Sequence, residues 1–557
     1  MQRIAIYQVL PRLYGNQNST NTPNGTIAEN GCGKMSAFTL ARLKRLRQFG
    51  YTHIWYTGLL EHATTTDYSQ YGITPDNPNI VKGKAGSPYA IKDYYDIDPD
   101  LADNPAERLS EFRALLERTH SAGLKAIIDF VPNHVSRQYH SDAAPQGIPQ
   151  LGAGDDMSKN FSPQNNFYYL GGETLTIDYT DKSQPYHEQP AKATGNDCFS
   201  PTPGICDWYE TVKLNYGVDY QGGMAHHFSP MPATWKQMTQ ILHFWASQGV
   251  DGFRCDMAEM VPSDFWHYAI STIKAEFPQI IFIAEVYNPY QYREYIHHGG
   301  FDYLYDKVGL YDTLRAILCG SQPASSLTSC WQSVDDIRSH MLSFLENHDK
   351  QRIASDYFIA NPERALPAMV VALSWGTNPF MIYAGQELGE RGMDEEGFSG
   401  RDGRTTIFDY WSPSTLRKLP YGVSRLSSEE RKLYETYKCL VEMQNSNPAL
   451  REGSFYDLTY ANTEGNPSFD AHSHYAFLRS HKGRHVLIVC NFSGQRAQVA
   501  INIPKHAFEY SQIKEGTVRA TEMLTHRHLD LHLSSITPLQ TTVPAYGAVC
   551  LIFFQKI

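Results

Sequence analysis

The sequence predicts an α/β fold: a (β/α)8 TIM barrel with an inserted domain after the third strand and a C-terminal antiparallel β-sandwich. Strand-like and helix-like segments alternate from the first residues to about residue 390, which is typical of such a barrel. One connection, between His134 and Pro232, is far longer than the others. Beyond residue 447 the apolar pattern changes to a period of two, which is typical of antiparallel strands.

Eight short apolar runs, each bounded by turn residues, are the predicted barrel strands. They are Ile4–Leu10, His53–Thr57, Ala126–Val131, Gly252–Asp256, Ile280–Val286, Asp302–Tyr305, Ser343–Asn347 and Phe380–Gly385. Helical periodicity fills the gaps between them, most clearly over Ser36–Phe49, Pro105–Ala122, Pro232–Gln248 and Asp264–Phe277. A proline in the first turn of the second and third of these helices supports their assignment.

The chain therefore divides into three predicted domains. The barrel comprises residues 1–134 and 216–447, and the inserted domain comprises residues 135–215. The long connection is rich in Gly, Pro, Asn, Ser and Tyr, and a loop of that length is usually functional or a small domain. Placed after the third strand, it would overhang the barrel mouth. Residues 448–557 form the predicted β-sandwich, with His485–Cys490 and Ala548–Phe553 as period-two examples.

Composition excludes several classes of function. The net charge is -11, and the one basic run, Arg42–Arg47, has the pattern of a helix face, so nucleic-acid binding is not expected. No apolar stretch is long enough to span a membrane. Aromatic residues make up 13% of the chain, which suits a cleft where sugar rings stack on aromatic rings.

The N-terminal segment Met1–Tyr7 already has a strand pattern and leaves no room for a signal peptide. We expect a cytoplasmic protein, or a periplasmic or secreted one if an export signal was removed from the sequence. Nine dilute cysteines favour free thiols. Cys198 and Cys206 are the one local pair that could form a disulfide, and no Cys/His spacing resembles a zinc site.

Three carboxylates follow predicted strands and are the leading catalytic candidates. Asp256, Glu285 and Asp349 each come after an apolar run, and the C-terminal strand ends of a parallel barrel converge on one mouth. Close carboxylates acquire separated pKa values, as acid and nucleophile chemistry on a glycosidic bond requires. A single such acid would more often be a helix N-cap. Arg254 two residues before Asp256, and His348 beside Asp349, favour a site.

Six segments resemble glycoside hydrolase family 13, the α-amylase family, in the same order along the chain. They are Pro88–Pro99, Asp129–His134, Val212–Asn215, Gly252–Asp256, Ala284–Glu285 and Glu346–Asp349. The resemblance covers essentially the whole chain. Within the family, the chain most resembles the branches that act on oligosaccharides and cyclodextrins.

The resemblance implies that Asp256 is the nucleophile, Glu285 the general acid/base and Asp349 a third carboxylate that grips sugar hydroxyls. The residues support these roles, because retention needs an ionised carboxylate below the anomeric carbon and a protonated acid beside the leaving oxygen. Arg254 shares a strand face with Asp256. We expect its guanidinium to lower the pKa of Asp256 and keep it ionised.

The resemblance also implies the substrate contacts. Tyr89 would provide the stacking platform for the reacting sugar, and His134 and His348 would contact the same ring. Asp129 would be structural, helping to fix Arg254.

No cofactor is expected to be required, although Asn133 resembles the calcium-ligand Asn of the family. Oxygen ligands suit calcium, but one Asn does not make a site. Asp155, Asp156 and Asp207 in the insert are candidate partners for it.

Glu259 marks a departure from the family pattern. Starch-cutting α-amylases usually carry Lys-His at the third and fourth positions after the nucleophile, where this chain has Glu259 and Met260. We expect Glu259 at the leaving-group side of the cleft, favouring short chains. The alternative is a surface or helix-start residue.

The predicted function is a retaining hydrolase of α-glucosidic bonds, most simply α-1,4 bonds in malto-oligosaccharides or related α-glucans. An α-glucan transglycosylase or isomerase using the same three carboxylates is the alternative, and a non-catalytic glucan-binding protein is a third class. An α-glucan substrate is the only partner expected, and the sequence does not predict an oligomeric state.

Overall fold

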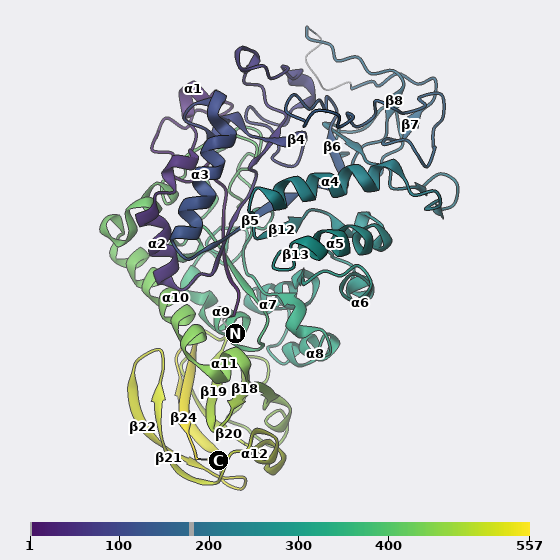
Figure 1. Ribbon diagram of the computed structural model, residues 1–557. Coiled ribbons are helices and arrows are strands. Elements are labelled where there is room, and N and C mark those ends of the chain that lie inside the picture. The colour runs from purple at the N-terminus through teal and green to yellow at the C-terminus, as the bar shows by residue number, and fades with distance from the viewer. Residues whose placement is uncertain (1–2, 178–182, 557) are drawn as a thin grey trace.

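The computed structural model describes residues 3–177 and 183–556 (Figure 1). Eight parallel strands form its central sheet: β1 Ala5–Val9, β2 His53–Tyr56, β5 Lys125–Phe130, β12 Gly252–Cys255, β13 Ile281–Ala284, β14 Tyr303–Tyr305, β15 Met341–Leu342 and β16 Phe380–Tyr383. The spatial order is β15-β14-β13-β12-β5-β2-β1-β16. A parallel bridge from Ser343 to Phe380 joins the two outer strands and closes the barrel. The predicted barrel is confirmed.

The seventh strand differs from its prediction. The sequence indicates Ser343–Asn347, whereas the ladder covers Met341–Leu342 and ends in the single bridge at Ser343. Beyond it, Glu346 accepts hydrogen bonds from Arg352 (2.8 Å) and from the backbone N–H of Ile353 (2.7 Å). These contacts belong to the following loop, so residues 344–347 leave the sheet and lead into the barrel mouth.

Helices surround the barrel (Figure 1). Along the barrel segments they are α1 Ile27–Asn30, α2 Leu40–Phe49, α3 Arg108–Ser121, α4 Ala233–Ser247, α5 Ser263–Glu276, α6 Tyr292–His297, α7 Asp312–Leu318, α8 Ser326–Ser333, α9 Leu366–Ser374 and α10 Ser428–Ser446. Two of them, α2 and α3, begin at least three residues later than predicted. Thr39 caps α2 by accepting from the Arg42 N–H, and Pro105 lies in a separate 3-10 turn that precedes α3.

The insert contains little regular structure. Its base is an antiparallel ladder between β6 His134–Ser136 and β9 Thr211–Lys213, with His134 opposite Lys213. Within the insert, β7 Tyr169–Leu170 pairs with β8 Ala191–Lys192; beyond residue 215, β10 Val218–Asp219 pairs with β11 Ala225–His226. In Figure 1 the insert lies at the opposite end of the molecule from the C-terminal strands.

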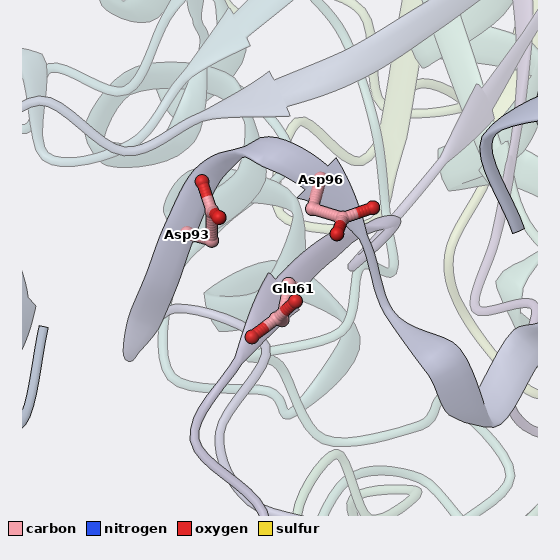
Figure 2. Close-up of side chains that lie close together, drawn as sticks. All are labelled: Glu61, Asp93 and Asp96. Carbon is pink, nitrogen blue, oxygen red and sulfur yellow. The ribbon is translucent and has the colours of Figure 1, made fainter. Parts of the chain in front are cut away.

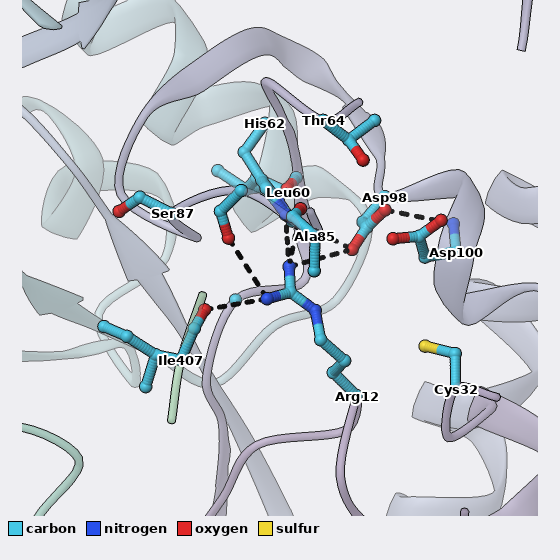
Figure 3. Close-up of polar contacts among 12 residues, drawn as sticks. Arg12, Cys32, Leu60, His62, Thr64, Ala85, Ser87, Asp98, Asp100 and Ile407 are labelled. Carbon is cyan, nitrogen blue, oxygen red and sulfur yellow. Dashed lines mark hydrogen bonds and ion pairs between the residues drawn. The ribbon is translucent and has the colours of Figure 1, made fainter. Parts of the chain in front are cut away.

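The part of the chain before the insert contains another antiparallel strand pair and a buried arginine. β3 Leu60–His62 pairs with β4 Ile91–Ile97. The Arg12 side chain, from the segment after β1, donates to the carbonyls of Ile407 (2.7 Å) and Gly86 (3.1 Å), and its guanidinium lies 4.0 Å from Asp98 Oδ2 (Figure 3). Gly86 has φ +81, and a Cβ there would lie 1.7 Å from a carbonyl oxygen. These contacts fix the chain just before Tyr89.

The C-terminal region is an antiparallel sandwich that follows α11 Pro448–Glu452. Its strands are β17 Ser454–Asp457, β18 His474–His481, β19 Arg484–Asn491, β20 Ala497–Ile501, β21 Gly516–Glu522, β22 Arg527–Leu533, β23 Leu539–Val543 and β24 Gly547–Phe554, with α12 Lys505–Ser511 between them. A six-stranded sheet, β17-β18-β19-β24-β21-β22, packs on the pair β20-β23 over one apolar core. Buried Arg479 donates to Ser374 O at 2.6 Å, which anchors this unit to the barrel.

All nine cysteines lie in the described part of the chain and are free, so Cys198 and Cys206 do not form a disulfide here. No helix within residues 3–177 and 183–556 is long and apolar enough to cross a membrane.

Candidate active site

Asp256 and Glu285 lie side by side beyond the ends of neighbouring strands. β12 pairs with β13 in a register that places Cys255 opposite Ala284, and each acid is the next residue. Arg254 lies between them. One terminal nitrogen donates to Asp256 Oδ1 at 2.7 Å, and the other donates to Glu285 Oε2 at 2.6 Å. All three side chains are buried, so one guanidinium bridges both predicted catalytic carboxylates.

Tyr305 and Asp129 hold the Arg254 guanidinium in place. Arg254 Nε donates to the Tyr305 hydroxyl at 3.1 Å, and Asp129 Oδ1 lies 3.6 Å from its terminal nitrogen. Asp129 in turn accepts from the Gly58 N–H (2.9 Å) and from Trp55 Nε1 (3.2 Å). Burial raises the pKa of Asp129 to about 6, and Arg254 opposes this rise. Asp129 lies below the mouth, as its predicted structural role requires.

The electrostatics of Asp256 differ from the sequence expectation. Burial raises the pKa of Asp256 above its ordinary value, Arg254 opposes the rise, and the neighbouring Glu285 charge adds to it. Arg254 lowers the pKa of Asp256, as predicted, but desolvation outweighs one shared guanidinium, so the pKa of Asp256 is raised on balance.

Glu285 has two further partners. The Tyr287 hydroxyl donates to Oε1 at 2.6 Å, and the backbone N–H of Met257 donates to Oε2 at 2.9 Å. Met257 adopts φ 41, a left-handed conformation uncommon for a non-glycine residue and typical of functional sites. Sequence reasoning missed Tyr287. Its position two residues after a strand-end acid was the available signal.

Asp349 is the most open of the three predicted catalytic acids. Its side chain is 37% exposed, and Oδ2 lies 3.3 Å from His348 Nε2. The Asn347 side chain accepts from the backbone N–H of Asp349 at 2.9 Å and shapes this turn. An exposed carboxylate beside two buried ones is positioned to accept hydrogen bonds from sugar hydroxyls.

A hydrogen-bond chain fixes the predicted sugar platform. Gln8 Nε2 lies 2.7 Å from His348 Nδ1, and His348 Nε2 lies 2.6 Å from the Tyr89 hydroxyl. The Tyr89 and His348 rings stack at 5.2 Å. Burial lowers the pKa of His348 well below its usual value, with help from Arg254. The imidazole is therefore neutral, with Nδ1 accepting from Gln8 and Nε2 donating to Tyr89.

Comparison with known proteins decides the family. The family model for the α-amylase catalytic domain matches residues 8–298, just over half of the chain. The chain belongs to the α-amylase family. It is therefore an α-amylase-family glycosidase, and the resemblance predicted from its six segments is confirmed.

Its relatives share the architecture at low identity. The chain is 21% identical to neopullulanase 2 of Thermoactinomyces vulgaris, over 90% of this chain and 71% of the relative. It is also 21% identical to cyclomaltodextrinase of Thermoanaerobacter pseudethanolicus, over 92% and 74% respectively. A maltogenic α-amylase from Thermotoga neapolitana superposes with a TM-score of 0.64 at 18% identity, covering 99% of both chains.

The insert of this α-amylase-family chain contributes an aromatic side chain, Trp208, that contacts His134. The His134 ring lies 5.3 Å from the ring of Trp208, which comes from the insert. Burial lowers the pKa of His134 to about 3, and Lys213 contributes, so His134 is neutral. It also hydrogen-bonds to the backbone of Tyr89. Trp208 was missed because its approach to His134 depends on how the irregular insert folds back.

The residues around Asn133 do not fit calcium. Asn133 Oδ1, the oxygen that would ligate the ion, accepts a hydrogen bond from Lys213 Nζ at 2.7 Å. Lys213 is buried and also lies 2.6 Å from Asp197 Oδ1. A calcium ion bound there would face this ammonium group. The metal expectation at Asn133 is therefore corrected: Lys213 supplies the positive charge that joins barrel and insert.

The acids proposed as partners of Asn133 are engaged elsewhere. Asp155 accepts from the backbone of Asn166 at 2.7 Å, Asp156 from Ser158, and Asp207 from the backbone of Gly204 at 2.7 Å.

Glu259 lies in the first turn of the short 3-10 helix Ala258–Met260, which agrees with the predicted alternative of a helix-start residue. Its Oε2 accepts from the backbone N–H groups of Tyr287 and Asn288, each at 2.9 Å. The carboxylate therefore secures the loop after β13, which carries the Tyr287 hydroxyl to Glu285. This is a positioning role for Glu259, and its direct contact with the leaving-group sugar stays a prediction.

Proposed function

We propose that this protein is a retaining glycosidase that hydrolyses α-1,4-glucosidic bonds of malto-oligosaccharides or related α-glucans. The observation that carries the proposal is the Arg254 bridge between Asp256 and Glu285. Retaining enzymes hold their two carboxyl groups about 5–5.5 Å apart, a separation that one guanidinium can span.

The reaction has two displacements. Asp256 attacks the anomeric carbon while the bond to the leaving oxygen breaks, and Glu285 gives its proton to that oxygen. Water then attacks the same carbon, Glu285 takes a proton from it, and Asp256 is released. Arg254, Tyr287 and the Met257 N–H all donate to Glu285. They stabilise the negative charge that forms when Glu285 has given up its proton.

The neighbouring residues bind the sugar whose bond is broken. Asp349 accepts from hydroxyls beside the reacting carbon, and these bonds strengthen as positive charge develops on the ring. Tyr89 offers a ring face fixed by His348, so little entropy is lost when a sugar stacks on it. His134 is neutral and lies against the backbone of Tyr89. It would donate or accept one more hydrogen bond with the sugar.

The relatives support an α-glucan substrate. Both are described by names that refer to pullulan-type or cyclic maltodextrin substrates. The sequence argument for short chains depends on Glu259 contacting the acceptor sugar, and the contacts that Glu259 makes are with backbone N–H groups. We therefore propose the substrate class without a chain-length preference.

One experiment tests both substrate and stereochemistry. Purified enzyme is incubated with maltose to maltoheptaose, cyclodextrins, pullulan and sucrose, and early products are followed by proton NMR. The proposal expects shorter maltodextrins whose first-formed reducing end is the α-anomer. An initial β-anomer would mean inversion, products longer than the substrate would mean transfer in place of hydrolysis, and cleavage of sucrose alone would overturn the substrate class.

A further inference from the structure

Three acidic side chains gather on the β3–β4 hairpin, outside the active site. Glu61 lies on β3, and Asp93 and Asp96 lie on β4 (Figure 2). One carboxylate oxygen from each lies within 4.8 Å of the others, and all three side chains are buried. The strand register shifts on both sides of Glu61, which lies opposite Asp93. This irregular pairing brings the three acids together.

Glu61 is the unusual member of this group. Its side chain is 1% exposed, yet both carboxylate oxygens lack a hydrogen-bond partner among the residues that the structure describes. Buried polar groups are nearly always paired, and an isolated buried carboxylate is very costly. Figure 2 shows its carboxyl group beside those of Asp93 and Asp96. The unpaired oxygens therefore call for a ligand at this position.

The other two acids have partners that leave the group negatively charged. Asp96 forms an ion pair with Arg108, which donates to both of its oxygens, from Nε at 2.9 Å and from Nη2 at 2.5 Å. Asp93 accepts from neutral donors, Ser141 Oγ at 2.6 Å and the Ala143 N–H at 2.8 Å. The nearby Lys92 ammonium is paired with Asp76 at 3.2 Å. Three ionised carboxylates and one guanidinium carry a net charge of two negative units. One divalent cation would neutralise that charge.

We propose that Glu61, Asp93 and Asp96 bind a calcium ion. The donors are all oxygens, which suits a hard cation and excludes the nitrogen and sulfur preference of zinc. The three oxygens lie within 4.8 Å of one another, close enough for one ion to reach all of them at calcium bond lengths of about 2.3–2.6 Å. Calcium accepts irregular oxygen cages, whereas magnesium demands near-ideal octahedral geometry. Without a cation, burial and the two aspartates raise the pKa of Glu61 to about 9.

The ion would fasten the insert to β4, the strand that follows Tyr89. Asp93 is four residues after Tyr89 and holds Ser141 and Ala143 at the start of the insert. A cation on Asp93 would fix this junction, while Lys213 fixes the one at Asn133. The site is independent of the proposed glycosidase reaction, because none of its ligands touches the carboxylates of the barrel mouth.

Calcium binding to the whole protein tests the proposal. The enzyme is freed of metal with a chelating resin, then titrated with CaCl2 by calorimetry and heated with and without calcium. The expected result is one calcium per chain and a rise in Tm of roughly 2 °C or more at a hundredfold excess over Kd. Glu61→Gln should weaken binding at least a hundredfold and remove the rise in Tm.

The controls separate this site from other calcium sites. Asp264→Asn alters an exposed acid on α5 and should leave binding unchanged. Glu61→Asp keeps the charge on a shorter side chain and should bind with reduced affinity, which preserves the test if Glu61→Gln does not fold. No calcium-dependent rise in the wild type, or an unchanged rise in either Glu61 variant, would overturn the proposal and indicate that a proton neutralises Glu61.

Discussion

The guanidinium of Arg254 lies 2.6 Å from Glu285 Oε2, so the arginine predicted to serve the nucleophile also serves the acid/base. The sequence suggests only the contact with Asp256, which shares its strand. The second contact depends on the register of β12 with β13. One positive charge therefore contacts two buried acids, and the Glu285 charge helps to raise the pKa of Asp256.

The first prediction concerns pH. Burial raises the pKa of Asp256 above its ordinary 3.8, and the nucleophile acts only when ionised. Activity should therefore be lost as the pH falls, with the acid limb of kcat/KM above pH 3.8. Arg254→Lys removes the two-pronged contact that opposes the rise, so it should move this limb to higher pH and lower kcat/KM about a hundredfold.

Steady-state pH profiles check this prediction, with tryptophan fluorescence at each pH to show that the protein remains folded. An acid limb that does not move in Arg254→Lys would argue against control by this guanidinium.

Replacement of the nucleophile should abolish turnover. An amide cannot form the glycosyl ester, so Asp256→Asn should lose many orders of magnitude in kcat on maltotriose while Tm stays close to that of the wild type. Asp264→Asn, on the exposed start of α5, is the matched control and should remain fully active. Activity of Asp256→Asn within tenfold of the wild type would show that another residue is the nucleophile.

Loss of the buried ammonium should destabilise the insert. Lys213→Met leaves Asn133 Oδ1 and Asp197 without their partner. Breaking a buried pair costs about 3–5 kcal/mol, but Asp197 is 33% exposed, so we expect a fall of about 2 kcal/mol in the free energy of unfolding. Urea denaturation measures it.

Lys159→Met is the control for this change, because its ion pair with Asp156 is exposed and should contribute less than about 1 kcal/mol. Calcium should not rescue Lys213→Met. Equal stability of the two variants would show that Lys213 is dispensable at the junction.

Glu259→Lys separates two roles for that residue. Removing the acceptor for the Tyr287 and Asn288 N–H groups should displace the loop and weaken the contact of Tyr287 with Glu285. We expect kcat to fall about tenfold, the loss of one hydrogen bond to a charged group, equally on maltotriose and maltoheptaose. A change confined to one chain length would instead show direct contact with the substrate.

The barrel and the three acids were accessible from sequence because they depend on local patterns. Apolar runs ending in Asp256 and Glu285 report both a strand and its C-terminal end. The missing features depend on contacts between distant segments. Gln8 reaches His348 across the barrel, 340 residues away in the chain.

Lys213 shows the same limit. The motif around Asn133 identifies an oxygen donor, but the charge facing it is set by the pairing of β6 with β9. The positioning role of Glu259 was not predicted, because its backbone partners lie on the loop after the next strand. The sequence contains no sign that Glu61 lies near Asp93, because their distance depends on the irregular pairing of β3 with β4.

Trapping the glycosyl-enzyme tests the central claim most directly. A 5-fluoro-α-glucosyl fluoride forms its ester quickly and loses it slowly, so mass spectrometry of the digested protein identifies the nucleophile. We predict one added glycosyl group per chain, on the peptide that contains Asp256, and none in Asp256→Asn. A label on any other carboxylate, or no label in an enzyme that consumes the reagent, would contradict retention through Asp256.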